Sequence, residues 1–319
     1  MSKEKKIATR VSYGTALAEL GEEYPNLVVL DADLAGATQS KIFKDKYPDR
    51  FIDCGIAESN MMSIAAGLST TGIIPVAGTF AMFAAGRAYE QVRNSIGYPH
   101  LNVKIGATHA GISVGEDGAS HQCLEDIALM RVIPGMTVLS PADDTEAKEV
   151  VRAALEIQGP VYMRFSRYAT PVIYGPDHKF EIGKGTLVRE GKDVTIIASG
   201  LCVSSALEAA ELLAKEGIDA EVIDMASIKP LDEELILSSA AKTGRVVTAE
   251  EHNIIGGLGS AVAECLAEKA AVPFRMVRIG IRDRFGETGT AAQLLHKYQL
   301  DGEGIFAQVK DFISLSHNS

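Results

Sequence analysis

Short apolar runs rich in β-branched residues alternate along the chain with longer, alanine-rich segments that are apolar on one side. In the first half, such runs predict strands at "NLVVLDAD", "IIPVAGTF", "NVKIGATH", "MTVLSP" and "VYMRFS". Helices are predicted between them near residues 58–70, 84–97, 123–131 and 143–157. Strands that are apolar on both faces and separated by helices are typical of a parallel sheet covered on both sides.

Residues 169–192 interrupt this alternation with two prolines and four glycines, a composition that favours a linker or crossing segment. A second series then predicts strands at "VTIIASG", "AEVIDM", "RVVTAE" and "FRMVRIG". Its helices are predicted near residues 203–216, 231–241, 257–270 and 302–315. The pattern therefore predicts two doubly wound α/β domains, residues 1–170 and 191–319, joined by a linker at residues 171–190.

Composition and charge exclude several classes of protein. With a formal net charge of −11 over 319 residues, the chain has no basic field that would attract a nucleic acid. Its four cysteines lie far apart without a CxxC pair, so neither a disulfide framework nor a zinc site is expected. The charged start "MSKEKKIATR" leads into no signal peptide, and no apolar run approaches the length of a membrane span. We therefore expect a cytoplasmic protein that binds neither nucleic acid nor membrane.

The loop "GATHAGISVGEDGASHQ", residues 106–122, is the strongest candidate for a ligand site. It follows a predicted strand, and ligands of parallel α/β sheets bind beyond the carboxyl ends of the strands. His109, Asp117 and His121 supply donors and acceptors suited to polyhydroxylated substrates and proton transfer. A polar surface turn is the structural alternative. A metal site is a weaker one, because the spacing of these side chains defines no coordination geometry.

Two further stretches carry candidate residues. Phe80 and Phe83 follow the strand "IIPVAGTF" and can face one side, either as a stacking platform for a planar heterocycle or as ordinary core. Arg164 and Arg167 lie at the end of "VYMRFS", where Arg167 can bind a phosphate or form a surface ion pair. The glycine loop in "EEHNIIGGLGSAVAECLAE" lacks a phosphate-binding spacing, and packing of a helix start explains it better.

An isolated acid, Glu58, lies where a helix is predicted to begin, within "FIDCGIAESNM" at residues 51–61. An acid in a first helical turn is common, because the helix dipole favours negative charge there. Within eight residues on either side, the sequence supplies no nucleophile with its base, no phosphate loop and no metal-ligand cluster. Taken alone, Glu58 is either an ordinary first-turn acid or one part of a catalytic site whose other part lies elsewhere.

Taken together, these stretches resemble the C-terminal half of transketolase and, more broadly, related thiamine-diphosphate enzymes. The resemblance covers nearly the whole chain, and its elements occur in the family's order. They are "DADLAGAT", "GIAESNM", "TFAMF", "THAGISVGEDGASHQ", "FSR" and "EEHNIIGGLGS". The resemblance implies a pyrimidine-binding domain with a parallel sheet at residues 1–170, and a transketolase C-terminal-like domain with a mixed sheet at residues 191–319.

One family element is missing from the sequence. The family holds the cofactor's diphosphate and its Mg²⁺ through a "GDG" motif and later asparagines in a preceding domain, and no "GDG" occurs here. The resemblance therefore implies thiamine diphosphate as cofactor, with Mg²⁺ bound mainly by a separate N-terminal, pyrophosphate-domain subunit. It also implies a homodimer of this chain within an α2β2 heterotetramer.

On the cofactor side, the resemblance assigns Glu58 to catalysis through a hydrogen bond to N1′ of the aminopyrimidine. A carboxyl group in an apolar pocket readily shares a proton, which fits that assignment. The same resemblance places Phe80 and Phe83 around the aminopyrimidine ring. It places Asp33 and Leu34 at the dimer interface and the cofactor's edge.

On the substrate side, His121 matches the catalytic histidine near the reacting carbonyl. Asp117 matches the acid that recognises the C2 hydroxyl group of the sugar. His109 and Arg167 match residues that bind the sugar phosphate. The sequence departs from the family at Ala37, near which a phosphate-binding serine often lies, and at Gly86, close to the place of a further tyrosine.

The resemblance implies a C-terminal subunit of a split transketolase, which moves a two-carbon ketol unit between sugar phosphates in the pentose phosphate pathway. The β chain of a 2-oxo-acid dehydrogenase shares the glutamate and the fold, but "GEDGASHQ" with His109 upstream looks like the sugar enzymes. Half of a deoxyxylulose-type synthase is a lesser alternative. A catalytically silent binding module is another, against which the joint presence of Glu58, Asp117 and His121 argues.

Overall fold

A seven-stranded sheet organises the first half of the chain. The computed structural model describes residues 5–314, so the first four residues of the predicted N-terminal domain and the last position of the predicted helix 302–315 lie outside it. The strands run in the order β12-β6-β7-β5-β4-β2-β3, and all except β12 are parallel. Their bounds are β2 Leu27–Asp31, β3 Phe51–Asp53, β4 Ile74–Phe80, β5 Lys104–Thr108, β6 Thr137–Leu139, β7 Val161–Arg164 and β12 Ser227–Lys229.

Helices cover both faces of this sheet, as the apolar strands predict. Neighbouring residues of one strand enter opposite cores: Val29 packs with α1, α3 and α7, whereas Leu30 packs with α4 and α6. This alternation explains why the strands are apolar on both faces. The α-helices are α1 Thr9–Leu20, α2 Ala35–Thr38, α3 Lys41–Lys46, α4 Glu58–Ser69, α5 Tyr89–Gln91, α6 Asp126–Arg131 and α7 Asp144–Glu156.

The predicted helix at residues 84–97 is not one continuous α-helix. The π-helical turns η2, Phe83–Arg87, and η3, Val92–Gly97, flank α5 there. Ala88 N–H donates to the carbonyl of Phe83, five residues earlier, in place of the usual bond four residues back. Short 3₁₀ turns occur at η1 Pro48–Arg50 and η4 Ile112–Asp117.

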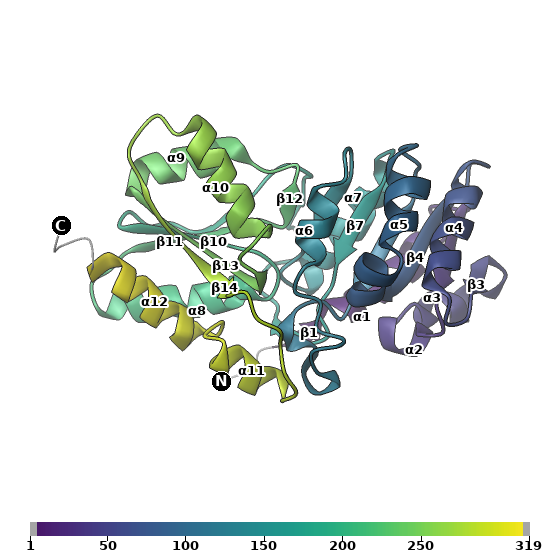
Figure 1. The fold of residues 1–319 in the computed structure, drawn as a ribbon, viewed down its shortest axis with the longest axis horizontal. Coiled ribbons are helices and arrows are strands. Elements are labelled where there is room, and N and C mark those ends of the chain that lie inside the picture. Colours follow the sequence, from purple (N-terminus) through teal and green to yellow (C-terminus); the bar gives the residue numbers. More distant parts are fainter. Residues whose placement is uncertain (1–4, 315–319) are drawn as a thin grey trace.

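A five-stranded sheet organises the second half, beside the first (Figure 1). Its order is β14-β13-β10-β11-β9, and only the edge strand β9 runs antiparallel. The strands are β9 Thr186–Arg189, β10 Val194–Ala198, β11 Ala220–Asp224, β13 Arg245–Asn253 and β14 Arg275–Ile281. The helices are α8 Cys202–Lys215, α9 Glu233–Thr243, α10 Leu258–Lys269, α11 Ala291–Lys297 and α12 Gly302–Ser314.

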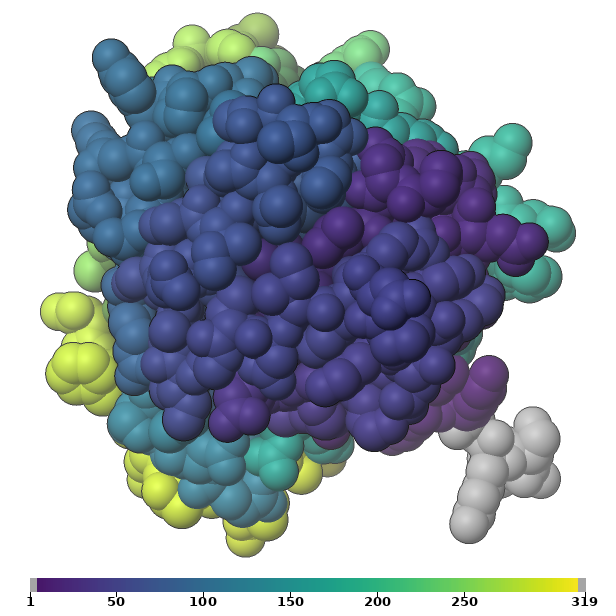
Figure 2. Space-filling view, turned by 90° about the vertical axis from the view of Figure 1, so that its right-hand side faces the viewer, coloured from purple at the N-terminus to yellow at the C-terminus, as the bar shows by residue number. Residues whose placement is uncertain are grey.

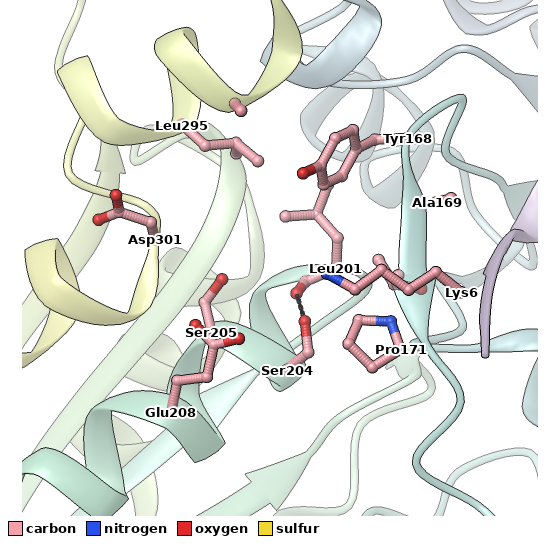
Figure 3. A pocket seen from close by; sticks show the side chains of 12 residues that line it. Lys6, Tyr168, Ala169, Pro171, Leu201, Ser204, Ser205, Glu208, Leu295 and Asp301 are labelled. Carbon is pink, nitrogen blue, oxygen red and sulfur yellow. Dashed lines mark hydrogen bonds between the residues drawn. The ribbon is translucent and has the colours of Figure 1, made fainter. Parts of the chain in front are cut away.

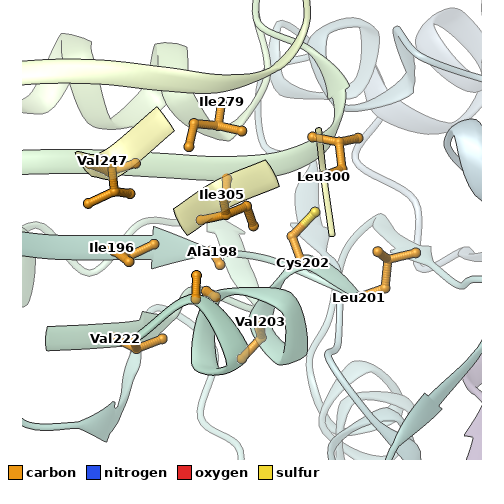
Figure 4. Close-up of a cluster of buried hydrophobic side chains, with 14 of the residues drawn as sticks. Ile196, Ala198, Leu201, Cys202, Val203, Val222, Val247, Ile279, Leu300 and Ile305 are labelled. Carbon is orange, nitrogen blue, oxygen red and sulfur yellow. The ribbon is translucent and has the colours of Figure 1, made fainter. Parts of the chain in front are cut away.

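The core of the second half lies between this sheet and its helices. Ile196, Val222 and Val247 project from three strands toward Ile305 of α12 (Figure 4). The opposite face of the sheet packs on α9 and α10. Both domains therefore have the α/β architecture that the sequence predicts. The first sheet, predicted as parallel, also has an antiparallel edge strand, β12.

The junction between the two halves contains a small two-stranded sheet and a buried arginine. At the junction, β1 Lys6–Ala8 pairs antiparallel with β8 Ala169–Pro171, and β9 lies inside the segment predicted as a linker. Arg164 is buried, and its Nε lies 2.8 Å from Asp126 Oδ2, while its Nη2 donates to the carbonyl of Glu251 in β13. Arg164 is therefore a structural residue between the halves.

The N-terminal third of the chain forms the face at the β3 end of the molecule. Figure 2 shows this face covered by purple and blue residues, with yellow C-terminal residues only at its margins. Within residues 5–314, no helix has both the length and the apolar character needed to cross a membrane.

Candidate active site

The carboxyl ends of β4 and β5 bring Phe80 and His109 together. Phe80 is the last residue of β4 and pairs in register with Thr108, so His109 follows directly beside it. The two rings stack with their centroids 3.8 Å apart and their planes inclined by 24°. His109 has a φ of 55°, an uncommon backbone conformation for a residue with a side chain, which turns the loop away from the strand here.

His109 is buried and held in its neutral form. Burial, together with the nearby cations Arg10 and Arg167, lowers the pKa of His109 to about 3. Its Nε2 lies 3.4 Å from Arg10 Nη1, and its Nδ1 lies 3.0 Å from Thr108 Oγ1. Because a guanidinium can only donate, Nε2 is the acceptor and Nδ1 carries the proton. His109 is thus oriented as a fixed dipole beside two positive charges.

Phe83 and His121 complete an aromatic cluster with Phe80 and His109. The Phe80 and Phe83 rings lie 6.0 Å apart and within 10° of parallel. His121 meets Phe83 edge-on, with centroids 5.5 Å apart at 77°, and its Nδ1 lies 3.0 Å from Ser120 Oγ. Phe80 is buried, whereas Phe83 and His121 are partly exposed, so one side of the cluster is open to a ligand.

Glu58 lies beside this aromatic cluster at the first position of α4. Its side chain is only 2% exposed, and Arg87 Nη1 lies 3.0 Å from Oε1 and 2.9 Å from Oε2. The Arg87 guanidinium also lies over the Phe83 ring, 4.6 Å from its centroid. The Glu58 carboxylate is therefore joined to the aromatic cluster through one half-exposed arginine.

Positive charge gathers on the other side of His109. Arg167 Nη1 donates to the carbonyl of Val114 and lies 3.9 Å from Asp117 Oδ2. Arg10 donates to the carbonyl of Ala37, and its buried Nε has no hydrogen-bond partner among the described residues. A buried donor without a partner is costly, so this Nε points to a bound acceptor. Arg10 and Arg167 thus place two positive charges near His109, and the carboxylates of Glu116 and Asp117 lie beside Arg167.

The structure places Asp33 and Leu34 beside this site, on the turn after β2. Asp33 is exposed with a φ of 61°, and its N–H donates to Asp53 Oδ1 at 3.2 Å. Leu34 N–H donates to Asp31 Oδ1 at 2.6 Å. Because β2 neighbours β4, the turn belongs to the same sheet edge as Phe80, but it forms a rim that faces outward.

The remaining candidates have structural explanations. In the glycine loop, the Glu250 carboxylate accepts the N–H groups of Leu258 and Gly259, so the start of α10 is already capped and offers no phosphate site. Across the described part of the chain, no group of three His, Cys, Asp or Glu side chains could hold a metal ion.

A cavity of about 170 Å³ lies elsewhere, between the two halves (Figure 3). Leu201, Leu295 and Tyr168 contribute to its walls together with Lys6 and Asp301, and Ser204 Oγ donates to the carbonyl of Leu201 at 2.9 Å. None of the residues predicted for the active site lines it, so the candidate chemistry stays at the ends of β4 and β5.

Arg10 and Arg87 are residues of the site that the sequence did not reveal. Arg10 begins a helix whose apolar pattern is weak, and Arg87 lies in a segment predicted as a plain helix. The sequence holds no local signal for either contact, since both partners come from distant strands and helices.

Comparison with known proteins identifies the class. The family model "Transketolase, pyrimidine binding domain" matches residues 5–172, and "Transketolase, C-terminal domain" matches residues 183–305. A putative transketolase C-terminal section from Methanocaldococcus jannaschii is 53% identical over 304 residues, covering 95% of each chain. Human transketolase is 39% identical over 313 residues, which cover 97% of this chain but 49% of the human protein.

A solved structure described as a split-gene transketolase, an inactive beta4 tetramer, has a TM-score of 0.90 to this chain. It is 55% identical, and the match covers 97% of this chain and 99% of that one. The fold and the two matched domains are therefore those of thiamine-diphosphate-type enzymes. The chain belongs to the transketolase family and corresponds to the C-terminal section of a split transketolase. This assignment decides against the β chain of a 2-oxo-acid dehydrogenase.

Proposed function

We propose that this chain forms the C-terminal half of a two-chain transketolase that moves a two-carbon ketol unit between sugar phosphates. The observation that carries the proposal is the continuity of the site. A buried carboxylate, an aromatic cluster with two histidines and a pair of arginines adjoin one another at one sheet edge. Each part fits a different portion of a cofactor–sugar phosphate pair.

The residues present fit the aminopyrimidine end of thiamine diphosphate. Glu58 presents two carboxylate oxygens that now bind the N–H groups of a displaceable side chain, and Phe83 offers a flat surface beside them. When bound, the cofactor supplies the electron sink for cleavage of a carbon–carbon bond of the ketose. Glu58 would hold the proton shared with the pyrimidine ring, and Phe80 and Phe83 would orient that ring.

On the substrate side, His121 would exchange protons with the reacting carbonyl and hydroxyl groups, because it lies at the open side of the aromatic cluster. Arg10 and Arg167 would bind the sugar phosphate, with the neutral His109 between them as a hydrogen-bonding partner. Asp117, which is exposed and near Arg167, would accept a hydrogen bond from a sugar hydroxyl.

The described residues offer no comparable set of side chains for the diphosphate end of the cofactor. Because residues 5–314 hold no candidate metal cluster, we place Mg²⁺ and the diphosphate mainly on a separate N-terminal subunit with the pyrophosphate domain. The proposed assembly is an α2β2 heterotetramer built on a homodimer of this chain, with Asp33 and Leu34 at the interface. We further propose a pyrimidine-binding domain at residues 1–170, a linker at 171–190, a C-terminal-like domain at 191–319, and a cytoplasmic role in the pentose phosphate pathway.

The test is ketol transfer from xylulose 5-phosphate to ribose 5-phosphate, with thiamine diphosphate and Mg²⁺ present. The chain is assayed alone, beside a candidate pyrophosphate-domain chain alone, and as a mixture of the two. We expect transfer in the mixture only. Transfer by this chain alone would overturn the proposed division of the site, and silence in a mixture whose chains demonstrably associate would overturn the proposed reaction.

A further inference from the structure

Arg87 satisfies the contacts that the proposed cofactor ring would need. Its guanidinium is flat, donates Nη1–H bonds to both oxygens of Glu58 and lies over the Phe83 ring. A protonated or amino-substituted pyrimidine is also flat, donates N–H groups to a carboxylate and stacks on an aromatic ring. One side chain of the protein therefore presents the same combination of charge, donors and planarity as the ligand.

The two partners differ in their freedom to leave this contact. The Glu58 side chain is 2% exposed, whereas that of Arg87 is 51% exposed. Within residues 5–314, Arg87 supplies the only hydrogen bonds that the Glu58 carboxylate accepts. A buried carboxylate without a partner is strongly unfavourable, but an arginine can turn into water at little cost. The Glu58 carboxylate therefore needs a hydrogen-bonding partner, and Arg87 is a partner that a ligand can displace.

Local backbone geometry sets up this contact. The π-helical turn from Phe83 to Arg87 closes with the bond from Ala88 N–H to the Phe83 carbonyl. Arg87 follows Phe83 by four residues, which places both side chains on one side of the turn, and the guanidinium lies over the Phe83 ring. The exposed Gly86 immediately before Arg87 adds no side chain that would block its movement.

We infer that Arg87 acts as an exchangeable latch on Glu58: it pairs with the carboxylate in the cofactor-free chain and is displaced when the aminopyrimidine ring binds. This inference rests on the proposed function. The latch keeps the buried charge compensated before assembly, at the cost of competing with the cofactor. Arg87 is thus a positioning residue whose removal should weaken the cofactor-free fold and strengthen cofactor binding.

The experiment compares wild type, Arg87→Met and Arg87→Lys. As a matched control, Arg93→Met removes an exposed arginine nearby whose side chain, within residues 5–314, donates a hydrogen bond only to Asn94. Binding of thiamine diphosphate at saturating Mg²⁺ is measured by calorimetry on the complex with the N-terminal partner chain. The melting temperature of the cofactor-free chain is measured separately. These readouts do not depend on turnover.

We expect Arg87→Met to bind thiamine diphosphate about tenfold more tightly than wild type, since the ring no longer displaces a side chain. The cofactor-free variant should melt about 2–4 °C lower, because Glu58 loses its partner. Arg87→Lys should recover most of the melting temperature while binding the cofactor more tightly than wild type, because an ammonium cannot cover the Phe83 ring as a flat guanidinium does. Arg93→Met should change neither quantity.

Two results would overturn the latch while leaving the proposed function intact. Weaker cofactor binding by Arg87→Met would make Arg87 a direct contact of the bound cofactor. Unchanged binding and melting would make the ion pair an incidental surface contact. If the assembled wild-type complex takes up no thiamine diphosphate at all, the latch and the proposed function fail together. The comparison therefore separates the two failures.

Discussion

Phe80 and His109 stack at 3.8 Å because two parallel strands, β4 and β5, end in register beside each other. A shift of one residue in that register would place the two side chains on opposite faces of the sheet. The stack also explains the electrostatics, since one face of the imidazole meets a phenyl ring where water would otherwise solvate its charge. Two arginines then disfavour protonation further.

His109 should therefore stay neutral throughout the physiological range. With its pKa lowered to about 3, the folded chain should show no His109 titration between about pH 5 and about pH 8. Imidazole NMR shifts of the folded chain test this, with His109→Gln used to assign the signal. A titration of that signal with a midpoint near the ordinary histidine value would contradict the described environment.

Substitution of Glu58 should abolish turnover with little loss of assembly. Glu58→Gln keeps the shape but cannot exchange a proton, so we expect ketol transfer to fall by at least about 100-fold in the assembled complex. Glu58→Ala should do the same. Size-exclusion chromatography with the partner chain checks assembly, and Glu90→Gln, at an exposed position nearby, serves as the control. Near-normal transfer by either Glu58 variant would refute the proposed assignment.

Phe83 should contribute mainly to the cofactor rather than to folding, because it is only partly buried. Removing an aromatic stacking surface typically costs about 0.5–1.5 kcal/mol, so Phe83→Ala should raise the thiamine diphosphate concentration for half-maximal activity about 3–10-fold. Phe285→Ala removes a ring that is 85% exposed and should leave this concentration unchanged. Equal effects of the two substitutions would argue against a stacking surface at Phe83.

A buried acidic cluster at the junction between the halves should contribute less to the stability of the chain as the pH rises. Burial raises the pKa of Glu146 to about 7 and, together with Glu146 itself, raises that of Asp224 well above its ordinary value. Tyr174 O–H donates to Asp224 Oδ2 at 2.8 Å, and His178 Nε2, whose pKa is lowered by partial burial, lies 3.6 Å from Glu146 Oε1. The folded chain therefore keeps protons that the unfolded chain releases near pH 4.5.

Because the folded state keeps these carboxyl protons in this window, the cluster's contribution to the free energy of unfolding should fall as the pH rises from about 4.5 to about 7, opposite in sign to the contribution of His109, whose pKa is lowered. Glu146 should account for roughly 2 kcal/mol of this loss. Glu146→Gln is neutral at every pH and should remove that part of the slope in urea unfolding, whereas Glu149→Gln on the same helix should not. A slope that is identical in both variants would show that Glu146 releases its proton at its ordinary pKa.

The elements with strong β-branched runs could be predicted, and each predicted strand is present. Helix α1 was missed because nearly all of its sides are buried, so its sequence shows little contrast between an apolar and a polar face. Tyr13 and Leu17 pack in the core, Ser12 is buried as well, and a side chain on Gly14 would collide with the backbone of Gln39. The strands β3, β9 and β12 were also missed. Unlike the equally short β6 and β7 they lie at the edges of their sheets, where a strand does not need the apolar run by which buried strands are recognised.

The residues of the candidate site also divide into those that the sequence reveals and those that it does not. Glu58, Phe80, Phe83 and the histidine loop lie at strand ends and helix starts, which a sequence displays directly. Arg10 and Arg87 act through contacts between distant segments, and a charged residue on a helix looks the same in sequence whether it faces water or a buried acid. Tertiary contact alone distinguishes these arginines from the others.

Strand β12 belongs to the second half by sequence but closes the edge of the first sheet, pairing antiparallel with β6. A gene fragment that ended after the pyrimidine-binding domain would leave β6 with unpaired N–H and C=O groups along an open edge, which is a template for aggregation. The two domains that the family models match therefore cannot be exchanged independently of each other. Exchanging C-terminal domains between relatives would also replace the outermost strand of the recipient's catalytic sheet.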